Sequence, residues 1–167
     1  NYLFPINDEV DLWLDEKTLL PVRIHENINE GNYKRKNTIK FFQSKGKAII
    51  NNIDTISFNS DIHSPYSLFY FFRKFDIANY KNKTINLFQK KSANAIRINI
   101  ENKVTLNTNI GKYICTKISP IRSDRKQFKN KSSISIWFSE DSKKSPVQIW
   151  LKMKYGGLML KLEETIN

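Results

Sequence analysis

Apolar and polar residues alternate along most of the chain, which is the pattern of half-buried β-strands. Val10, Leu12 and Leu14 share one face of such a strand, and the last strands of the chain show the pattern most clearly. The alternation predicts strand-like segments, some of them very short, over residues 10–15, 22–28, 38–43, 48–53, 84–89, 96–100, 104–106, 113–118, 134–138, 147–155 and 158–162. We therefore expect a mostly β fold: a curved antiparallel sheet, either a half-barrel or an open barrel, of about 8–10 strands.

Short polar or glycine-containing segments predict how these strands are connected. A tight turn is predicted at Glu101-Asn102-Lys103, and the end of a strand at Ser119-Pro120. Ser139 to Ser145 is a polar loop, and Gly156-Gly157 predicts a two-residue hairpin turn because glycine tolerates a positive φ. The most polar stretch, residues 122–131, predicts a further loop.

One segment departs from strand periodicity and predicts the single helix, at about residues 64–76. Ser64 is suited to the N-cap and Pro65 to the first turn. The residues expected on one apolar face are Leu68, Phe71, Phe72 and Phe75. Phe69 and Tyr70 lie elsewhere on the helix, so we expect it to be covered on more than one side.

Large apolar residues also occur on strand faces that should point to solvent, namely Trp13, Phe42, Phe88, Trp137 and Trp150. A curved sheet wrapped around the helix accounts for them. The aromatic residues that could face an apolar ligand in the hollow are Trp13, Phe69, Tyr70, Phe72, Trp137 and Trp150. The alternative is that they simply fill a two-sided core.

The 167 residues suit a single domain over 1–167, and the formal net charge of +12 has two explanations. One is an anionic partner, such as an anionic polymer or lipid surface; the candidate residues are Lys34, Arg35, Lys36, Arg122, Arg125 and Lys126. The other is a coding bias that favours lysine, asparagine and isoleucine. Nucleic acid is not expected, because no recognisable binding motif accompanies the basic clusters.

The sequence contains no motif typical of catalysis or of cofactor binding. It lacks a glycine-rich phosphate loop, a GxSxG elbow and an HExxH helix. His25, His63 and Cys115 are too scattered to predict a metal site, and a lone cysteine forms no internal disulfide. We therefore predict no catalytic residue, no cofactor and no metal, and no apolar run is long enough for a transmembrane helix.

Four motifs in order resemble the bacterial envelope proteins catalogued as DUF3108, a domain of unknown function. The segment from Leu12 to Arg23 resembles the family's W-x-D-x-x-T-x-x-P-v-r strand pair, and Asp61 to Arg73 its helix. Thr108 to Tyr113 is similar to its T-p-l-G-t-f turn, and Ile136 to Val147 resembles its i-W-l-S-d-D hairpin. The resemblance implies a periplasmic or outer-membrane-associated protein preceded by further strands and a secretion signal. By fold analogy with the lipoprotein-carrier half-barrel, it also implies an apolar ligand.

Three functional hypotheses remain open. The first is an envelope binding or scaffold module that can hold a lipid-like ligand in the concave face of its sheet. The second is a basic module that binds an anionic envelope component, either a polymer or a lipid surface. The third is an enzyme, which would need a cleft with converging polar groups around His25 or Cys115.

Overall fold

The computed structural model describes residues 5–81, 83–89, 91–122, 133–152 and 156–164. These residues divide into two compact units, which we describe separately. Unit 1 comprises Asn1–Phe71 with Asn86–Asn94, and unit 2 comprises Phe72–Ile85 with Ala95–Asn167. No helix among the described residues is both long and apolar enough to cross a membrane.

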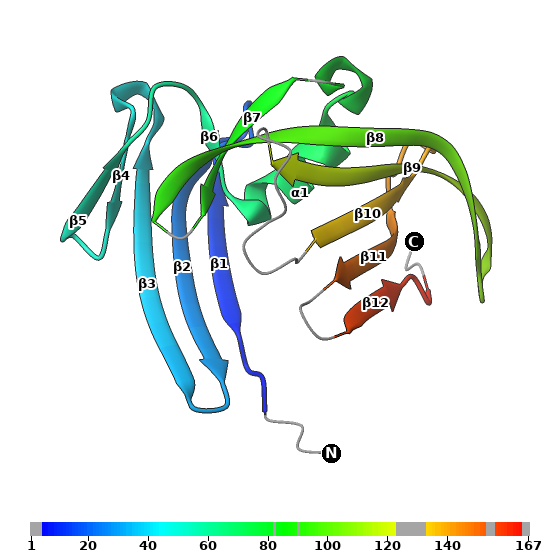
Figure 1. The fold of residues 1–167 in the computed structure, drawn as a ribbon, viewed down its shortest axis with the longest axis horizontal. Coiled ribbons are helices and arrows are strands. Elements are labelled where there is room, and N and C mark those ends of the chain that lie inside the picture. Colours follow the sequence, from blue (N-terminus) through cyan, green and yellow to red (C-terminus); the bar gives the residue numbers. More distant parts are fainter. Residues whose placement is uncertain (1–4, 82, 90, 123–132, 153–155, 165–167) are drawn as a thin grey trace. The chain divides into compact units, whose positions relative to one another are not determined.

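Unit 1 contains a five-stranded antiparallel sheet, sheet A, in which neighbours in sequence are neighbours in space (Figure 1). Its strands are β1 (Glu9–Leu14), β2 (Pro21–Glu30), β3 (Tyr33–Phe42), β4 (Lys47–Ile50) and β5 (Asp54–Ser57). A short helix, η1 (Gln43–Lys45), precedes β4. Gly46 follows it with φ of 57°, and a Cβ there would collide with the carbonyl oxygen of Phe58.

The remaining strands form a seven-stranded sheet, sheet B, with the order β12-β11-β10-β9-β8-β7-β6. They are β6 (Ile62–His63), β7 (Thr84–Gln89), β8 (Ser92–Thr108), β9 (Gly111–Arg122), β10 (Ser133–Ser139), β11 (Pro146–Lys152) and β12 (Gly157–Lys161). The β6–β7 pair is parallel, and the other pairs with a described register are antiparallel. Figure 1 shows that β8 and β9 bend along their length.

The helix α1 (Pro65–Lys74) begins where the sequence predicts, directly after Ser64. The Ser64 hydroxyl accepts a hydrogen bond from the Ser67 N–H at 3.0 Å, and the Ser67 hydroxyl accepts one from the Ser64 N–H at 2.8 Å. Leu68, Phe71 and Phe72 are buried, as expected for the apolar face. A second short helix, η2 (Ile77–Tyr80), follows α1.

The predicted fold class, a mostly β protein with a curved antiparallel sheet and one α-helix, is confirmed. The described residues contain twelve strands in two sheets rather than about 8–10 in one. The difference arises partly from β5 and β6, which have four and two residues and are too short to show a period.

Three predicted connections are wrong in detail. Glu101 to Lys103 is an irregularity inside the continuous strand β8, where the register with β9 shifts and Lys103 has φ of 56°. Strand β9 continues through Pro120, which pairs with Ile98. Gly157 is the first residue of β12 and pairs with Lys152, so the Gly156-Gly157 pair is not itself the turn. The predicted loop at 122–131 lies, apart from Arg122 at the end of β9, outside the described residues.

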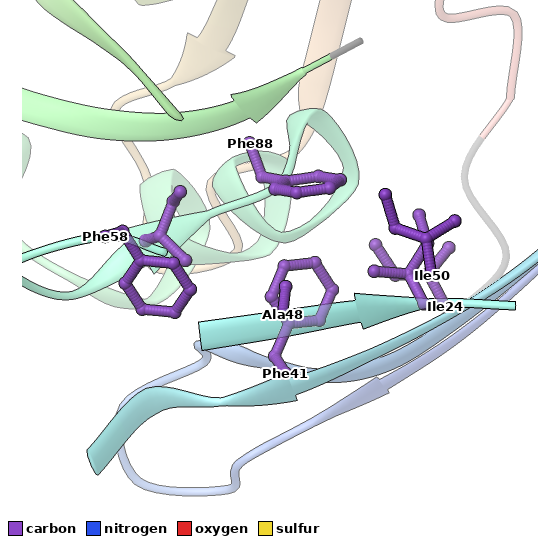
Figure 2. Close-up of a cluster of buried hydrophobic side chains, with 8 residues drawn as sticks. Ile24, Phe41, Ala48, Ile50, Phe58 and Phe88 are labelled. Carbon is purple, nitrogen blue, oxygen red and sulfur yellow. The ribbon is translucent and has the colours of Figure 1, made fainter. Parts of the chain in front are cut away.

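The core of unit 1 lies against one face of sheet A, which we call the inner face. Figure 2 shows side chains of sheet A meeting Phe58 and Phe88, and the rings of Phe41 and Phe88 are 5.2 Å apart in an edge-on arrangement. The buried cluster consists of Ile24, Ile39, Phe41, Ala48, Ile50, Phe58, Ile62 and Phe88. Tyr66, in the first turn of α1, packs against this cluster.

Unit 2 buries a second set of apolar side chains on four consecutive strands, β8 to β11. They are Ile96, Ile98, Cys115, Ile118, Ile136, Phe138 and Val147. Strand β12, the edge strand paired with β11, is exposed along its whole length. The Trp150 ring lies so close to Gly157 that a Cβ there would collide with it.

Candidate functional site

A pocket of about 530 Å³ opens on the inner face of sheet A, entirely within unit 1. Ile24, Ile39 and Ile50 form its apolar floor, and Phe88 forms a side wall. The first turn of α1 contributes Ser64, Pro65 and Tyr66. Its size falls within the roughly 300–1,000 Å³ that is typical of small-molecule sites.

The polar side of this pocket is built around Glu26. The side chain is only 12% exposed, because position 26 shares the inner face of β2 with Ile24 and Ile28. Its Oε2 accepts hydrogen bonds from Arg35 Nη2 at 3.1 Å and from Asn37 Nδ2 at 3.0 Å. A buried carboxylate is tolerated when paired and hydrogen-bonded in this way.

Tyr66 connects the helix to this polar group. Burial raises the pKa of its phenol above the usual value, and the negative charge of Glu26 together with a hydrogen bond to it raises the pKa further. The phenol is therefore protonated at neutral pH and available as a hydrogen-bond donor. Gln89 and Lys91 complete the polar rim, where Lys91 also forms an ion pair with Asp54 at 2.6 Å.

The pocket thus combines an apolar floor with a rim of hydrogen-bonding and charged groups. Glu26 is bonded to Arg35 and Asn37, and Lys91 pairs with Asp54, so these charged groups are compensated within the protein. This arrangement suits an amphipathic molecule better than a fully polar one.

The six aromatic candidates for ligand contact do not line this pocket and are divided between the units. Trp13 lies on the opposite face of sheet A, where Arg23 and His25 contact its ring at 5.2 and 5.3 Å. Phe69 and Tyr70 contact each other on α1, and Phe72 is buried. In unit 2, Lys117 lies 5.5 Å above the Trp137 ring, and Trp150 covers Gly157.

Of the candidate anion-binding residues, Lys34, Arg35 and Lys36 fall in β3, where strand alternation separates them. Arg35 points to the inner face and pairs with Glu26, whereas Lys34 and Lys36 lie on the opposite face. Arg122 ends β9, and Arg125 and Lys126 lie outside the described residues.

Glu26 and Tyr66 were not predicted as site residues. The available signal was a charged residue at a position of β2 that shares its face with Ile24 and Ile28. Its partners Arg35 and Asn37 depend on the β2–β3 register, in which Glu26 lies opposite Asn37.

Two side chains that could suggest nucleophilic chemistry, those of Cys115 and Ser67, are shielded from solvent. Cys115 is fully buried, and burial, with the nearby charges of Glu140 and Asp141, raises the pKa of its thiol to about 11. Ser67 Oγ lies 3.4 Å from His63 Nδ1, but Ser67 is fully buried and its hydroxyl caps α1. Neither thiol nor hydroxyl has the open setting that a nucleophile needs.

Metal ligands do not converge in the part of the chain that the structure describes. No group of three or more His, Cys, Asp or Glu side chains is placed so that it could hold a metal ion there. Burial lowers the pKa of His63 to about 4, against a minor opposing effect of Asp61, so its imidazole is neutral at pH 7.

Comparison with known proteins gives a family but no characterised relative. No curated protein matches the chain, and no solved structure matches it. The model of one family, described as "Protein of unknown function (DUF3108)", matches residues 1–163. The chain therefore belongs to the DUF3108 family.

Proposed function

We propose that the protein binds an apolar, lipid-like ligand in the pocket on the inner face of sheet A. The observation that supports this proposal is the pocket of about 530 Å³ with an isoleucine floor and a rim formed by Glu26, Arg35 and Lys91. The isoleucines of the floor are already almost fully buried, so an acyl chain would gain mainly dispersion contacts with them rather than a large area removed from water. A polar end of the ligand would remain at the rim.

The cellular location stays a prediction from the family resemblance. A periplasmic or outer-membrane-associated protein would meet lipid-like molecules, which agrees with the proposed ligand. The structure supports the ligand class through the pocket alone.

Binding can be tested with a fluorescent fatty acid, such as cis-parinaric acid, whose emission rises in an apolar site. Gln89 lines the pocket, its side chain is exposed, and it forms no side-chain hydrogen bond with another described residue that a substitution would break. Gln89→Trp should therefore fill the entrance and weaken binding about tenfold or more, the equivalent of about 1.4 kcal/mol. Gln89→Ala is the matched control and should bind like the unmodified protein.

Two results would count against the proposal. If the unmodified protein binds no fatty-acid probe and releases no lipid in native mass spectrometry, the ligand class is wrong. If Gln89→Trp binds the probe as tightly as Gln89→Ala, the ligand occupies a different site.

A further inference from the structure

The outer face of sheet A, opposite the pocket, carries a row of cations. Inner-face residues alternate with outer-face residues along β3, so Lys34, Lys36 and Lys40 all point outward. Arg23 lies beside Lys40, because these two residues are paired in the β2–β3 register. We call these four residues the basic strip; from Lys34 to Lys40 it extends about 20 Å at 3.4 Å per residue.

The cations of the basic strip have no carboxylate partner among the described residues. The ion pairs in the described part of the chain join Arg35 to Glu26, Lys91 to Asp54 and Lys117 to Glu101. Within the basic strip, Lys40 Nζ makes only a long 3.4 Å hydrogen bond to Asn52 Oδ1, and Arg23 contacts the Trp13 ring. The charge of the strip is therefore available to an external partner.

Overall composition does not account for this row. Unit 1 contains ten Lys and Arg residues and nine Asp and Glu residues, so it is close to neutral. The three lysines of β3 all lie on its outer face, and no carboxylate of β2 or β3 shares that face with them. The acidic residues of the outer face, Glu9 and Asp11, lie on β1 and line a shallow pocket with Lys36, but neither forms an ion pair with it among the described residues.

Trp13 distinguishes between two kinds of anionic partner. It belongs to the same row as Arg23 and Lys40 and is 44% exposed. Single-stranded nucleic acid is bound by open aromatic faces, whereas Arg23 lies over the Trp13 ring. Trp13 instead lies at one end of the basic strip, in the row of Arg23 and Lys40, and an exposed tryptophan at the margin of a basic surface suits a lipid headgroup layer.

We propose that the outer face of sheet A docks on an anionic lipid bilayer, with the basic strip against the headgroups and Trp13 at their level. This surface does not depend on the pocket, which opens on the other face of the same sheet. Each lysine near an anionic bilayer contributes to the free energy of binding. The removal of three lysines should therefore weaken binding about a hundredfold.

The test is co-sedimentation with vesicles of phosphatidylcholine alone or mixed with phosphatidylglycerol, at low and high salt. The test variant is Lys34→Gln/Lys36→Gln/Lys40→Gln. The control Lys81→Gln/Lys112→Gln/Lys161→Gln removes the same charge from exposed lysines of unit 2. We expect salt-sensitive binding to the anionic vesicles only, lost in the test variant and kept in the control.

Each other outcome would overturn the proposal. Equal losses in both triple variants would show attraction by net charge rather than by this face. Binding to single-stranded DNA or polyphosphate without binding to vesicles would identify a soluble polyanion as the partner. Gln89→Trp should bind vesicles normally, so failure of the pocket and failure of the docking face can be told apart.

Discussion

Glu26 shows how one residue can join a hydrophobic core to a polar rim. It occupies an inner-face position of β2, yet Arg35 and Asn37 from the next strand satisfy its carboxylate. Loss of the carboxylate would leave the Arg35 guanidinium on the inner face without its ion-pair partner. The residue therefore orders the polar side of the pocket rather than merely solubilising the sheet.

His63 makes the stability of the protein depend on pH. Its pKa is about 4 in the folded state against 6.5 in the unfolded state, because burial disfavours the imidazolium. Below about pH 6.5 the unfolded chain therefore binds a proton that the folded protein excludes. The free energy of unfolding should fall as pH decreases, by about 2 kcal/mol between about pH 7 and pH 5, and this effect should vanish above about pH 7.

Urea unfolding at a series of pH values measures this dependence. His63→Phe should flatten the curve between about pH 7 and pH 5, because it removes the titrating group. His25→Gln, a change at the half-buried histidine of the outer face, should keep the slope. A slope that persists unchanged in His63→Phe would assign the dependence to other groups.

At the scale of elements, the start of α1 depends on a reciprocal pair of serines. Ser64→Ala removes the acceptor of the Ser67 N–H, and both residues are buried, so water cannot replace the lost bond. We expect the free energy of unfolding to decrease by about 1–2 kcal/mol. Denaturant titration tests this, with Ser44→Ala as the control at an exposed serine of η1; equal effects of the two substitutions would argue against the cap.

Local patterns predicted the elements better than their connections. Ser64 and Pro65 mark the helix start through chemistry that lies within one turn, and β7 spans the predicted Thr84–Gln89. Glu101 to Lys103 looks like a turn because the same polar residues suit turns and irregular strand positions. In the structure β9 pairs with β8 on both sides of this segment, so the segment is an irregularity within one strand and not a turn between two strands.

The candidate site was harder to predict, because it depends on contacts between distant segments. Phe88 was expected on a solvent-facing side of its strand, but it is buried against Phe41, 47 positions earlier in the sequence. Tyr66 reaches the pocket only because α1 packs its first turn on the inner face of sheet A. The aromatic excess correctly suggested apolar cover on both sides of some strands, but it did not indicate which aromatic residues line the pocket.

At the scale of the whole molecule, the two compact units share three secondary-structure elements. The division between units falls inside α1 at Phe71, inside β7 at Ile85 and inside β8 at Asn94. Domain boundaries normally lie in exposed linkers that few contacts cross. Unfolding either unit alone would require breaking α1 three residues before its end, β7 two residues after its start and β8 three residues after its start.

We therefore expect the units to unfold together, in one cooperative transition, as predicted for a single domain. The tryptophans allow a direct test, because Trp13 lies in unit 1 while Trp137 and Trp150 lie in unit 2. Trp137→Phe/Trp150→Phe leaves a probe of unit 1, and Trp13→Phe leaves probes of unit 2. After correction for each variant's stability by far-UV circular dichroism, fluorescence and dichroism should give the same midpoint in urea. The shared elements should prevent one unit from persisting without the other. A fluorescence midpoint that departs from the dichroism midpoint in opposite directions in the two variants would therefore mean that the units unfold independently.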